Sequence, residues 1–343
     1  MARNDMRSFV PTDVEGSTGE GERSAQRSRR GVLADYLAIA RFDHATKHVF
    51  IVPGIVLALL LRGVHENNFV AALILGAVSA LLIASANYCI NEYLDREFDK
   101  HHPTKSARTA VNIELSGGLV FLEWVLFVVV GLACALLAST TMFWVAFVFA
   151  LQGIVYNVRP FRSKDRAFLD VISESINNPL RLMIGWAMVD PTTLPPSSII
   201  LAYWFGGAFL MGCKRLSEYR EIVASHGKDL LTRYRASFHG YSEITLTVSV
   251  FVYALLSAFF LGVFLVKYRV EYLIVMPVLT ALFGKYLALS MLPGSTAQKP
   301  EKLFRERGLM FITALLGGLF LLATYVDIPS LNDLTEQQFI RVQ

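Results

Sequence analysis

Long apolar stretches alternate with polar connections along most of the chain. Nine stretches have about the length that a transmembrane helix needs, which is about 20 predominantly apolar residues. They lie at residues 48–63, 68–92, 117–138, 141–157, 168–190, 197–214, 242–266, 271–292 and 308–327. The first is the shortest, and polar side chains interrupt the fifth. The pattern predicts an all-α membrane protein, a bundle of nine transmembrane helices.

Lys and Arg residues are distributed unevenly between alternate connections. Of 32 such residues, 26 fall in the N-terminal segment and in the connections after the second, fourth, sixth and eighth stretches, and four fall on the opposite side. Connections rich in Lys and Arg remain in the cytoplasm. The bias therefore predicts a cytoplasmic N-terminus and, after nine crossings, a C-terminus outside. We expect the active site on the cytoplasmic side, because the longer connections lie there and loops commonly carry function.

Composition agrees with a membrane protein of one main domain. The chain of 343 residues is 54% hydrophobic and 17% charged, whereas soluble domains are about 25% charged. Residues 1–30 are polar and Arg-rich, without the apolar core of a signal peptide. We expect a disordered tail at 1–30, a transmembrane catalytic domain at 31–330 and a short outer tail at 331–343. The expected partners are the bilayer and membrane-bound substrates, without nucleic acid, and homo-oligomerisation stays open.

An oxygen-bearing ladder lies where the second stretch ends. Asn91, Asp95 and Asp99 are spaced four residues apart, so each step along a helix turns by about 40° and rises by about 6 Å. Carboxylates at this spacing repel one another, and a bound Mg²⁺ would remove that repulsion. The alternative is a solvated helix end, in which Arg96 and Lys100 neutralise the carboxylates. We favour a metal site because the ladder continues to the membrane boundary at Asn91.

Charged groups also follow two other cytoplasmic exits. They are Arg159, Arg162 and Lys164 after the fourth stretch, and Lys214, Arg215 and Glu218 after the sixth. Arg and Lys side chains capture phosphate oxygens, so both groups are candidates for phosphate binding. The alternatives are the positive charge that every cytoplasmic loop carries and a solvated helix end with a Lys214–Glu218 pair.

The fifth stretch carries ionisable residues inside a predicted span. Asp170 begins it and is a candidate second metal ligand. Glu174, Asn177, Asn178 and Arg181 recur on one helical face. Ionisable residues within a span are costly and are candidates for function. Arg181 is expected to pair with a carboxylate or with a substrate phosphate, and a purely structural ion pair is the alternative.

A family resemblance rests on these motifs. The N-x3-D-x3-D ladder, followed closely by "HPTK", resembles the first aspartate motif of the UbiA superfamily of membrane prenyltransferases, over roughly residues 33–327. Four segments resemble the decaprenyl-phosphate phosphoribosyltransferase branch: "ARFDHATKH" (40–48), "RAFLDVISESINNPLRLMIGW" (166–186), "GCKRLSEYREI" (212–222) and "QKPEKLFRERGLM" (298–310). The resemblance implies a UbiA-like bundle of nine helices with a cytoplasmic active site.

The resemblance implies a Mg²⁺-dependent transferase in the cell membrane. It would move a phosphoribosyl group from phosphoribosyl diphosphate to a polyprenyl phosphate, making a lipid-linked sugar for cell walls. The implied catalytic residues are Asn91, Asp95 and Asp99, which with Asp170 would also bind the metal. The implied substrate-binding residues are Lys47, Lys105, Arg159, Arg162, Lys164, Arg181, Lys214, Arg215 and Glu218.

Two alternatives to phosphoribosyl transfer remain open. Aromatic prenyltransferases of the superfamily carry a second aspartate-rich motif, which residues 212–222 lack. Its absence favours phosphoribosyl transfer over the first alternative, prenyl transfer to an aromatic or other acceptor. The second alternative is a transporter for an anionic solute, with Arg181 and Lys285 as pathway charges. The lack of an evident inverted repeat argues against a transporter.

Overall fold

The computed structural model describes residues 29–292, 294 and 306–331. The predicted tails at 1–30 and 331–343 lie almost wholly outside the described residues, as does most of the 298–310 segment. All regular elements of the described part are helical, which confirms the predicted all-α class. The longer elements are α2 (Arg29–Ile39), α3 (Val52–Leu61), α4 (Phe69–Asp99), α6 (Gly117–Ala138), α7 (Thr140–Asn157), α9 (Asn177–Ala187), α10 (Ser197–His226), α12 (Glu243–Tyr268), α13 (Met276–Met291) and α15 (Arg307–Tyr325).

Shorter helices complete the chain, mostly where it turns between the long ones. They are η1 (Phe42–Ile51), η2 (Lys105–Ala107), α5 (Thr109–Asn112), η3 (Ser163–Asp165), α8 (Leu169–Ser175), α11 (Lys228–Tyr234), η4 (Ala236–Gly240) and η5 (Val270–Val275).

Eight helical segments of the described residues are long and apolar enough to cross a membrane. They correspond to all the predicted stretches except the fifth, and the first of them runs from Ala34 to Leu61 through α2, η1 and α3. The fifth stretch forms two short helices, α8 and α9, which are interrupted at Ile176. Pro179 contributes to the interruption because it has no N–H to donate to the carbonyl of Ser175. The broken pair brings polar residues of both helices into the centre of the bundle.

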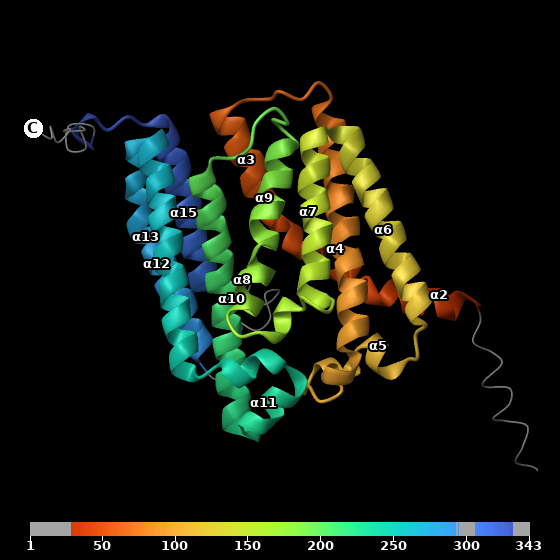
Figure 1. Ribbon diagram of the computed structural model, residues 1–343. Helices are drawn as coiled ribbons and strands as arrows, with labels where there is room; N and C mark the ends of the chain where they lie inside the picture. The colour runs from red at the N-terminus through yellow and green to blue at the C-terminus, as the bar shows by residue number, and fades with distance from the viewer. Residues whose placement is uncertain (1–28, 293, 295–305, 332–343) are drawn as a thin grey trace, which may run out of the picture.

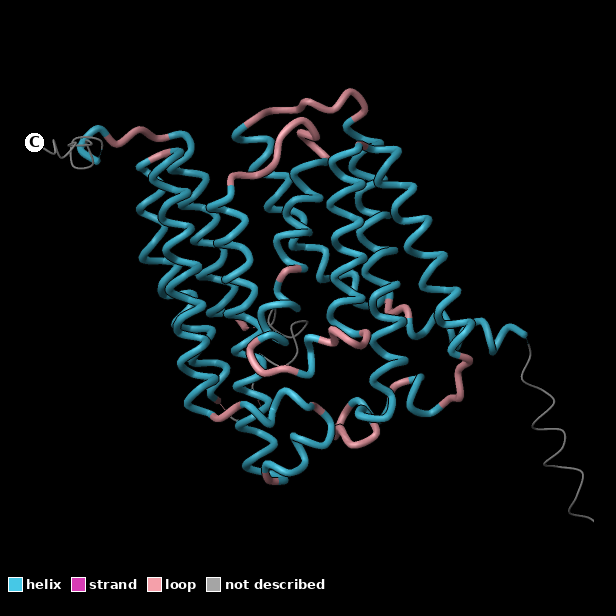
Figure 2. Tube along the Cα trace, in the orientation of Figure 1, coloured by secondary structure: helices cyan, strands magenta, loops and turns pink. Residues whose placement is uncertain are grey.

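The long helices stand side by side in two groups around the broken pair (Figure 1). Helices α4, α6 and α7 form one group, and α10, α12, α13 and α15 form the other, with α3, α8 and α9 between them. Buried Ile83, Phe149 and Ile184 join α4, α7 and α9 in one apolar core. The loops that lead to α5, α8 and α11 gather at the lower end in Figure 2. Three connections rich in Lys and Arg therefore meet at one end of the bundle.

Helices α3 and α9 cross at two glycines. A methyl group at Gly54 would lie 2.0 Å from the carbonyl oxygen of Leu182, and one at Gly185 would lie 2.2 Å from that of Ile51. Small residues let membrane helices approach closely and gain van der Waals contact. The contact holds α9, and with it Arg181, against the N-terminal part of the bundle.

We expect Gly185→Ala to destabilise the protein by about 1–3 kcal/mol, because the backbone of η1 cannot move away without disturbing α3. Thermal unfolding in detergent would measure the change. Gly262→Ala in α12 is the matched control, since nothing lies within 4 Å of the added methyl group. A melting temperature of Gly185→Ala equal to that of the control would contradict this close packing.

Candidate active site

A pocket with a large excess of positive charge opens at the end of the bundle where the three charged connections meet. Its volume is about 240 Å³. We call it the cationic pocket, and its lining residues are Arg41, His44, Lys47, Tyr88, Asn91, Asp95, His102, Thr104, Lys105, Arg108, Tyr156, Lys164, Glu174, Lys214, Arg215, Glu218 and Arg235. Eight are Lys or Arg, and three carry a carboxylate. This balance suits a ligand with several negative charges.

Asp95 is held by two cations from the connection after α7. Its Oδ1 accepts a hydrogen bond from Arg162 at 2.9 Å and lies 2.6 Å from the ammonium of Lys164. Burial lowers the pKa of Lys164 to about 8, even though the charge of Asp95 acts in the opposite direction. One turn earlier, Asn91 donates to Oδ1 of Asn157 at 2.6 Å. Asn91 and Asp95, the first two residues of the predicted ladder, therefore line the cationic pocket.

Asp99, the third residue of the ladder, does not line the pocket. It is 4% exposed, and Arg108 donates to its Oδ2 at 2.5 Å. Within the described part of the chain, no group of three or more His, Cys, Asp or Glu side chains is arranged to hold a metal ion. Asp95 and Asn91 still offer a carboxylate and an amide oxygen. That donor set fits Mg²⁺ that takes its remaining ligands from water and substrate phosphate.

Arg215 is the centre of a buried charge network. It donates to Asp170 at 3.1 Å, to Glu174 at 3.1 Å and to Glu218 at 3.4 Å. Asp170 is fully buried and also accepts a hydrogen bond from Tyr241 at 2.6 Å. Asp170 does not line the cationic pocket. It lies behind Arg215 and fixes the orientation of that guanidinium.

A second network of contacts, at the edge of the pocket, links the loop after α4 to α10 and α11. His102, from the "HHPTK" segment after α4, lies 3.3 Å from Glu218 of α10, and its ring centre lies 4.5 Å from that of Tyr234. Tyr234 in α11 also donates to Glu218, at 3.2 Å. The ammonium of Lys105 lies 5.8 Å from the centre of the Tyr234 ring. The loop after α4 is thus joined to α10 and α11.

Three lysines of the cationic pocket have no carboxylate within ion-pair distance in the described part of the chain. Lys47, Lys105 and Lys214 form no ion pair with a carboxylate of the described residues, and Lys47 lies 5.2 Å from the centre of the Tyr88 ring. Arg159, in contrast, is exposed at the surface and away from the pocket. The three lysines are the surplus charge that an anionic ligand would neutralise.

Several residues of the pocket were not predicted from the amino-acid sequence. Arg235 donates to the hydroxyl of Tyr156 at 2.9 Å and lies 3.5 Å from Asp170. Arg41 and Arg108 also line the pocket. Arg41 lies in the "ARFDHATKH" segment and Arg108 follows the ladder motif, so both had a local signal. Arg235 had none beyond its position in a connection rich in Lys and Arg.

Two further cavities continue from the cationic pocket into the bundle. The first, of about 230 Å³, shares Lys47, Asn91 and Lys214 with the pocket. We call it the amide cavity, because Asn87, Asn91, Gln152, Asn157, Asn177 and Asn178 line it together with Arg181. The second, of about 630 Å³, shares Phe50 and Asn178 with the amide cavity.

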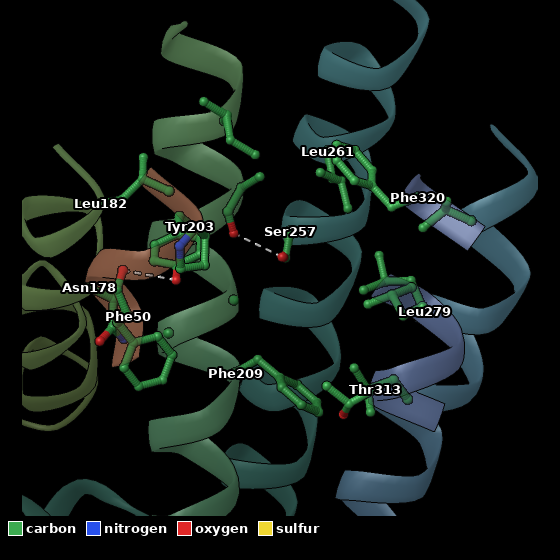
Figure 3. Close-up of a pocket in the computed structure, with 18 of the residues that line it drawn as sticks. Phe50, Asn178, Leu182, Tyr203, Phe209, Ser257, Leu261, Leu279, Thr313 and Phe320 are labelled. Atoms are coloured by element: carbon green, nitrogen blue, oxygen red, sulfur yellow. Dashed lines mark hydrogen bonds between the residues drawn. The ribbon is translucent and has the colours of Figure 1, made fainter. Parts of the chain in front are cut away.

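The second of these cavities is lined almost entirely by apolar side chains, and we call it the apolar cavity. Figure 3 shows Phe209 from α10 facing Leu279 from α13 and Phe320 from α15 across it. Asn178 and Phe50 lie together on the side towards the centre of the bundle. A charged pocket, a polar cavity and an apolar cavity thus follow one another, an order that suits an amphipathic lipid.

Comparisons with known proteins place this geometry in a family. Residues 49–325 match the model of the UbiA prenyltransferase family. A protoheme IX farnesyltransferase from Bacillus mycoides is 26% identical over 200 residues, which cover 55% of this chain and 62% of that protein. One from Bacillus cereus (strain B4264) is 26% identical over 218 residues, covering 59% of this chain and 68% of the relative.

Solved structures share the fold. A UbiA homolog from Archaeoglobus fulgidus, bound to DMAPP and Mg²⁺, superposes with a TM-score of 0.63 at 20% identity, covering 85% of this chain and all of that one. A digeranylgeranylglyceryl phosphate synthase superposes with a TM-score of 0.53 at 15% identity, covering 85% and 97%. The predicted UbiA-like fold and the prediction of an enzyme are confirmed, and the transporter alternative has no support in these relatives. The chain belongs to the UbiA prenyltransferase family and is a multi-pass membrane transferase.

Proposed function

We propose that the protein transfers a phosphoribosyl group from phosphoribosyl diphosphate to a polyprenyl phosphate. The observation that supports this most is the charge of the cationic pocket, which has eight Lys and Arg residues against three carboxylates. A prenyl diphosphate offers one diphosphate, whereas phosphoribosyl diphosphate adds a phosphate on the ribose. The larger number of anionic groups matches the unpaired ammonium groups of Lys47, Lys105 and Lys214.

Asp95 and Asn91 are the proposed ligands of a Mg²⁺ ion that arrives with the donor. The structural relative from Archaeoglobus fulgidus was solved with Mg²⁺ and an isoprenyl diphosphate, which supports a divalent metal in this fold. When bound, Mg²⁺ neutralises charge that develops on the leaving diphosphate. Lys214 and Arg215 lie on α10, in the segment where the second aspartate motif is missing. Of the two, Lys214 forms no ion pair with a carboxylate of the described residues, and it would supply positive charge in place of a second metal site.

The reaction needs no protein nucleophile. An oxygen of the acceptor phosphate is already anionic, so it attacks the anomeric carbon while the bond from that carbon to the diphosphate breaks. The donor is held in the cationic pocket by charge-assisted hydrogen bonds, and the acceptor tail lies in the apolar cavity. We further propose that the broken α8–α9 pair makes a ninth crossing. The charged end of the bundle would then face the cytoplasm from the plasma membrane.

Prenyl transfer is the second candidate, and the activities of the similar proteins favour it. Two of them are farnesyltransferases, and one structural relative was solved with an isoprenyl diphosphate. In that reaction the first isoprene units would lie next to the diphosphate. In this chain the cavity next to the cationic pocket is lined by amides and Arg181, which suits a polar group better than hydrocarbon.

The two candidate reactions can be distinguished by the substrate mixture from which the protein makes a labelled lipid product. Purified protein in detergent with Mg²⁺ would receive either labelled phosphoribosyl diphosphate with a polyprenyl phosphate, or labelled farnesyl diphosphate with 4-hydroxybenzoate or haem. We expect labelled product in the first mixture, and EDTA should abolish it. Product only in a farnesyl diphosphate mixture would establish prenyl transfer instead.

Asp95→Asn should lower kcat by about 100-fold or more, because the pocket loses its carboxylate for the metal and an electrostatic group of this kind contributes on that order. Glu97→Gln is the matched control on the same helix, since Glu97 is exposed and pairs only with Arg96 and Lys100 among the described residues. Steady-state kinetics and thermal unfolding would be measured for both variants. Equal activity of the two variants would remove Asp95 from the mechanism.

The affinity for the donor should fall as the pH rises through about 8. Lys164 has a pKa lowered to about 8, so it is charged below that pH and neutral above it. The donor phosphates are already ionised there, because their second pKa is about 6. We expect the KM for the donor to rise by up to about tenfold between pH 7 and pH 9. Lys164→Arg, which stays charged, should flatten the profile, and an unchanged rise in that variant would assign the titration to another group.

A further inference from the structure

We propose that Arg181, in the amide cavity, binds the anionic head of the acceptor lipid at a site separate from that of the donor. The inference rests on the proposed function for the identity of the acceptor. The charge and position of Arg181 are independent of it, because they follow from contacts within the bundle.

Arg181 is a buried cation without a counter-charge. Its side chain comes from α9 and is 6% exposed. Its Nε has no hydrogen-bond partner, and its Nη1 donates only to the backbone oxygen of Asn177, at 3.3 Å. The guanidinium carbon lies 5.0 Å from the centre of the Phe149 ring. No carboxylate of the described residues lies within 4.0 Å of it, and a buried charge in that state is costly unless a ligand neutralises it.

The nearest candidate for a counter-charge in the amide cavity is already engaged. Glu174 is the carboxylate that lines this cavity. It accepts a hydrogen bond from Tyr156 at 2.7 Å and from Arg215 at 3.1 Å. Glu174 therefore serves the network around Arg215 and leaves Arg181 unpaired. The two ammonium groups at the border with the cationic pocket, Lys47 and Lys214, add to the positive charge.

The position of the cavity identifies the ligand as a lipid head. The amide cavity shares Lys47 and Lys214 with the donor pocket and Phe50 and Asn178 with the apolar cavity. A molecule whose tail occupies the apolar cavity and whose head group enters the amide cavity would place that head group beside Arg181. A phosphate there would lie on the side of the anomeric carbon away from the protein surface. Its oxygen would form the new bond to that carbon, and the electrons of the broken bond would leave with the diphosphate.

Direct binding measurements test this without turnover. Purified full-length protein in detergent would be titrated calorimetrically with geranylgeranyl phosphate, geranylgeraniol, 4-hydroxybenzoate and phosphoribosyl diphosphate. We expect the wild type to bind the lipid phosphate about tenfold or more tightly than the alcohol, as a charge-assisted contact implies. Arg181→Met should lose most of this preference, while its affinity for phosphoribosyl diphosphate changes less than about twofold. Arg181→Lys should keep most of the preference.

Lys285→Met is the matched control, because it removes a positive charge from a membrane helix outside the three cavities. It should leave all four affinities unchanged. Equal binding of the phosphate and the alcohol by the wild type would overturn the proposal, and this result needs no variant. The proposal would also be overturned if Arg181→Met lost affinity for the lipid phosphate and for phosphoribosyl diphosphate to the same extent. It would likewise be overturned if the substitution changed only the affinity for 4-hydroxybenzoate.

The result of the binding measurements can be distinguished from the result of the activity assay. If the wild type prefers the lipid phosphate through Arg181 but makes no phosphoribosyl lipid, the anionic site stands and the proposed donor is wrong. If it makes the product but shows no preference, the proposed function stands and the site assignment is wrong.

Discussion

Charge compensation around the cationic pocket is the constraint on which the rest of the structure depends. Eight cations cannot share about 240 Å³ unless buried carboxylates neutralise some of them. Asp170, Glu174 and Glu218 surround Arg215, and Asp95 holds Lys164. Removing one partner of such a buried pair leaves an uncompensated charge, which is strongly destabilising. The acids therefore keep these cations in place, and a ligand would also find four cations that form no ion pair with a carboxylate of the described residues, namely Arg41, Lys47, Lys105 and Lys214.

In this arrangement the acidic residues mainly hold cations in place. In a site with two metal-binding motifs, carboxylates face the ligand and a metal ion carries the positive charge to the diphosphate. In this chain the three pocket carboxylates, those of Asp95, Glu174 and Glu218, pair with Arg, Lys or His side chains. Other cations line the pocket without such a pair. A site of that kind suits direct contact between its cations and phosphate groups. Its affinity should therefore depend on ionic strength and on the ionisation of its lysines.

The break between α8 and α9 lies where the cationic pocket continues into the interior of the bundle. A continuous helix would have its backbone hydrogen bonds satisfied within the helix. The interruption at Ile176 instead places Glu174 in the network of Arg215, and Asn177 and Arg181 beside the amide cavity. Non-helical backbone at membrane depth is tolerated where it is buried in protein or lines a cavity. The broken pair therefore supplies polar groups between a charged pocket and an apolar one.

The amino-acid sequence alone determined what depends on local periodicity. Hydropathy predicted eight of the membrane helices, and the spacing of Asn91, Asp95 and Asp99 placed a polar ladder at the charged end of α4. Most Lys and Arg residues of the pocket were predicted from the sequence, because Lys and Arg cluster in a few connections. Only the tertiary structure decided what each group faces. Asp99 turns to Arg108, and Asp170 is enclosed by Arg215 and Tyr241, partners 45 and 71 residues away. The physical reason is that periodicity assigns a residue to a helix face, whereas burial and pairing depend on which distant side chains pack against that face.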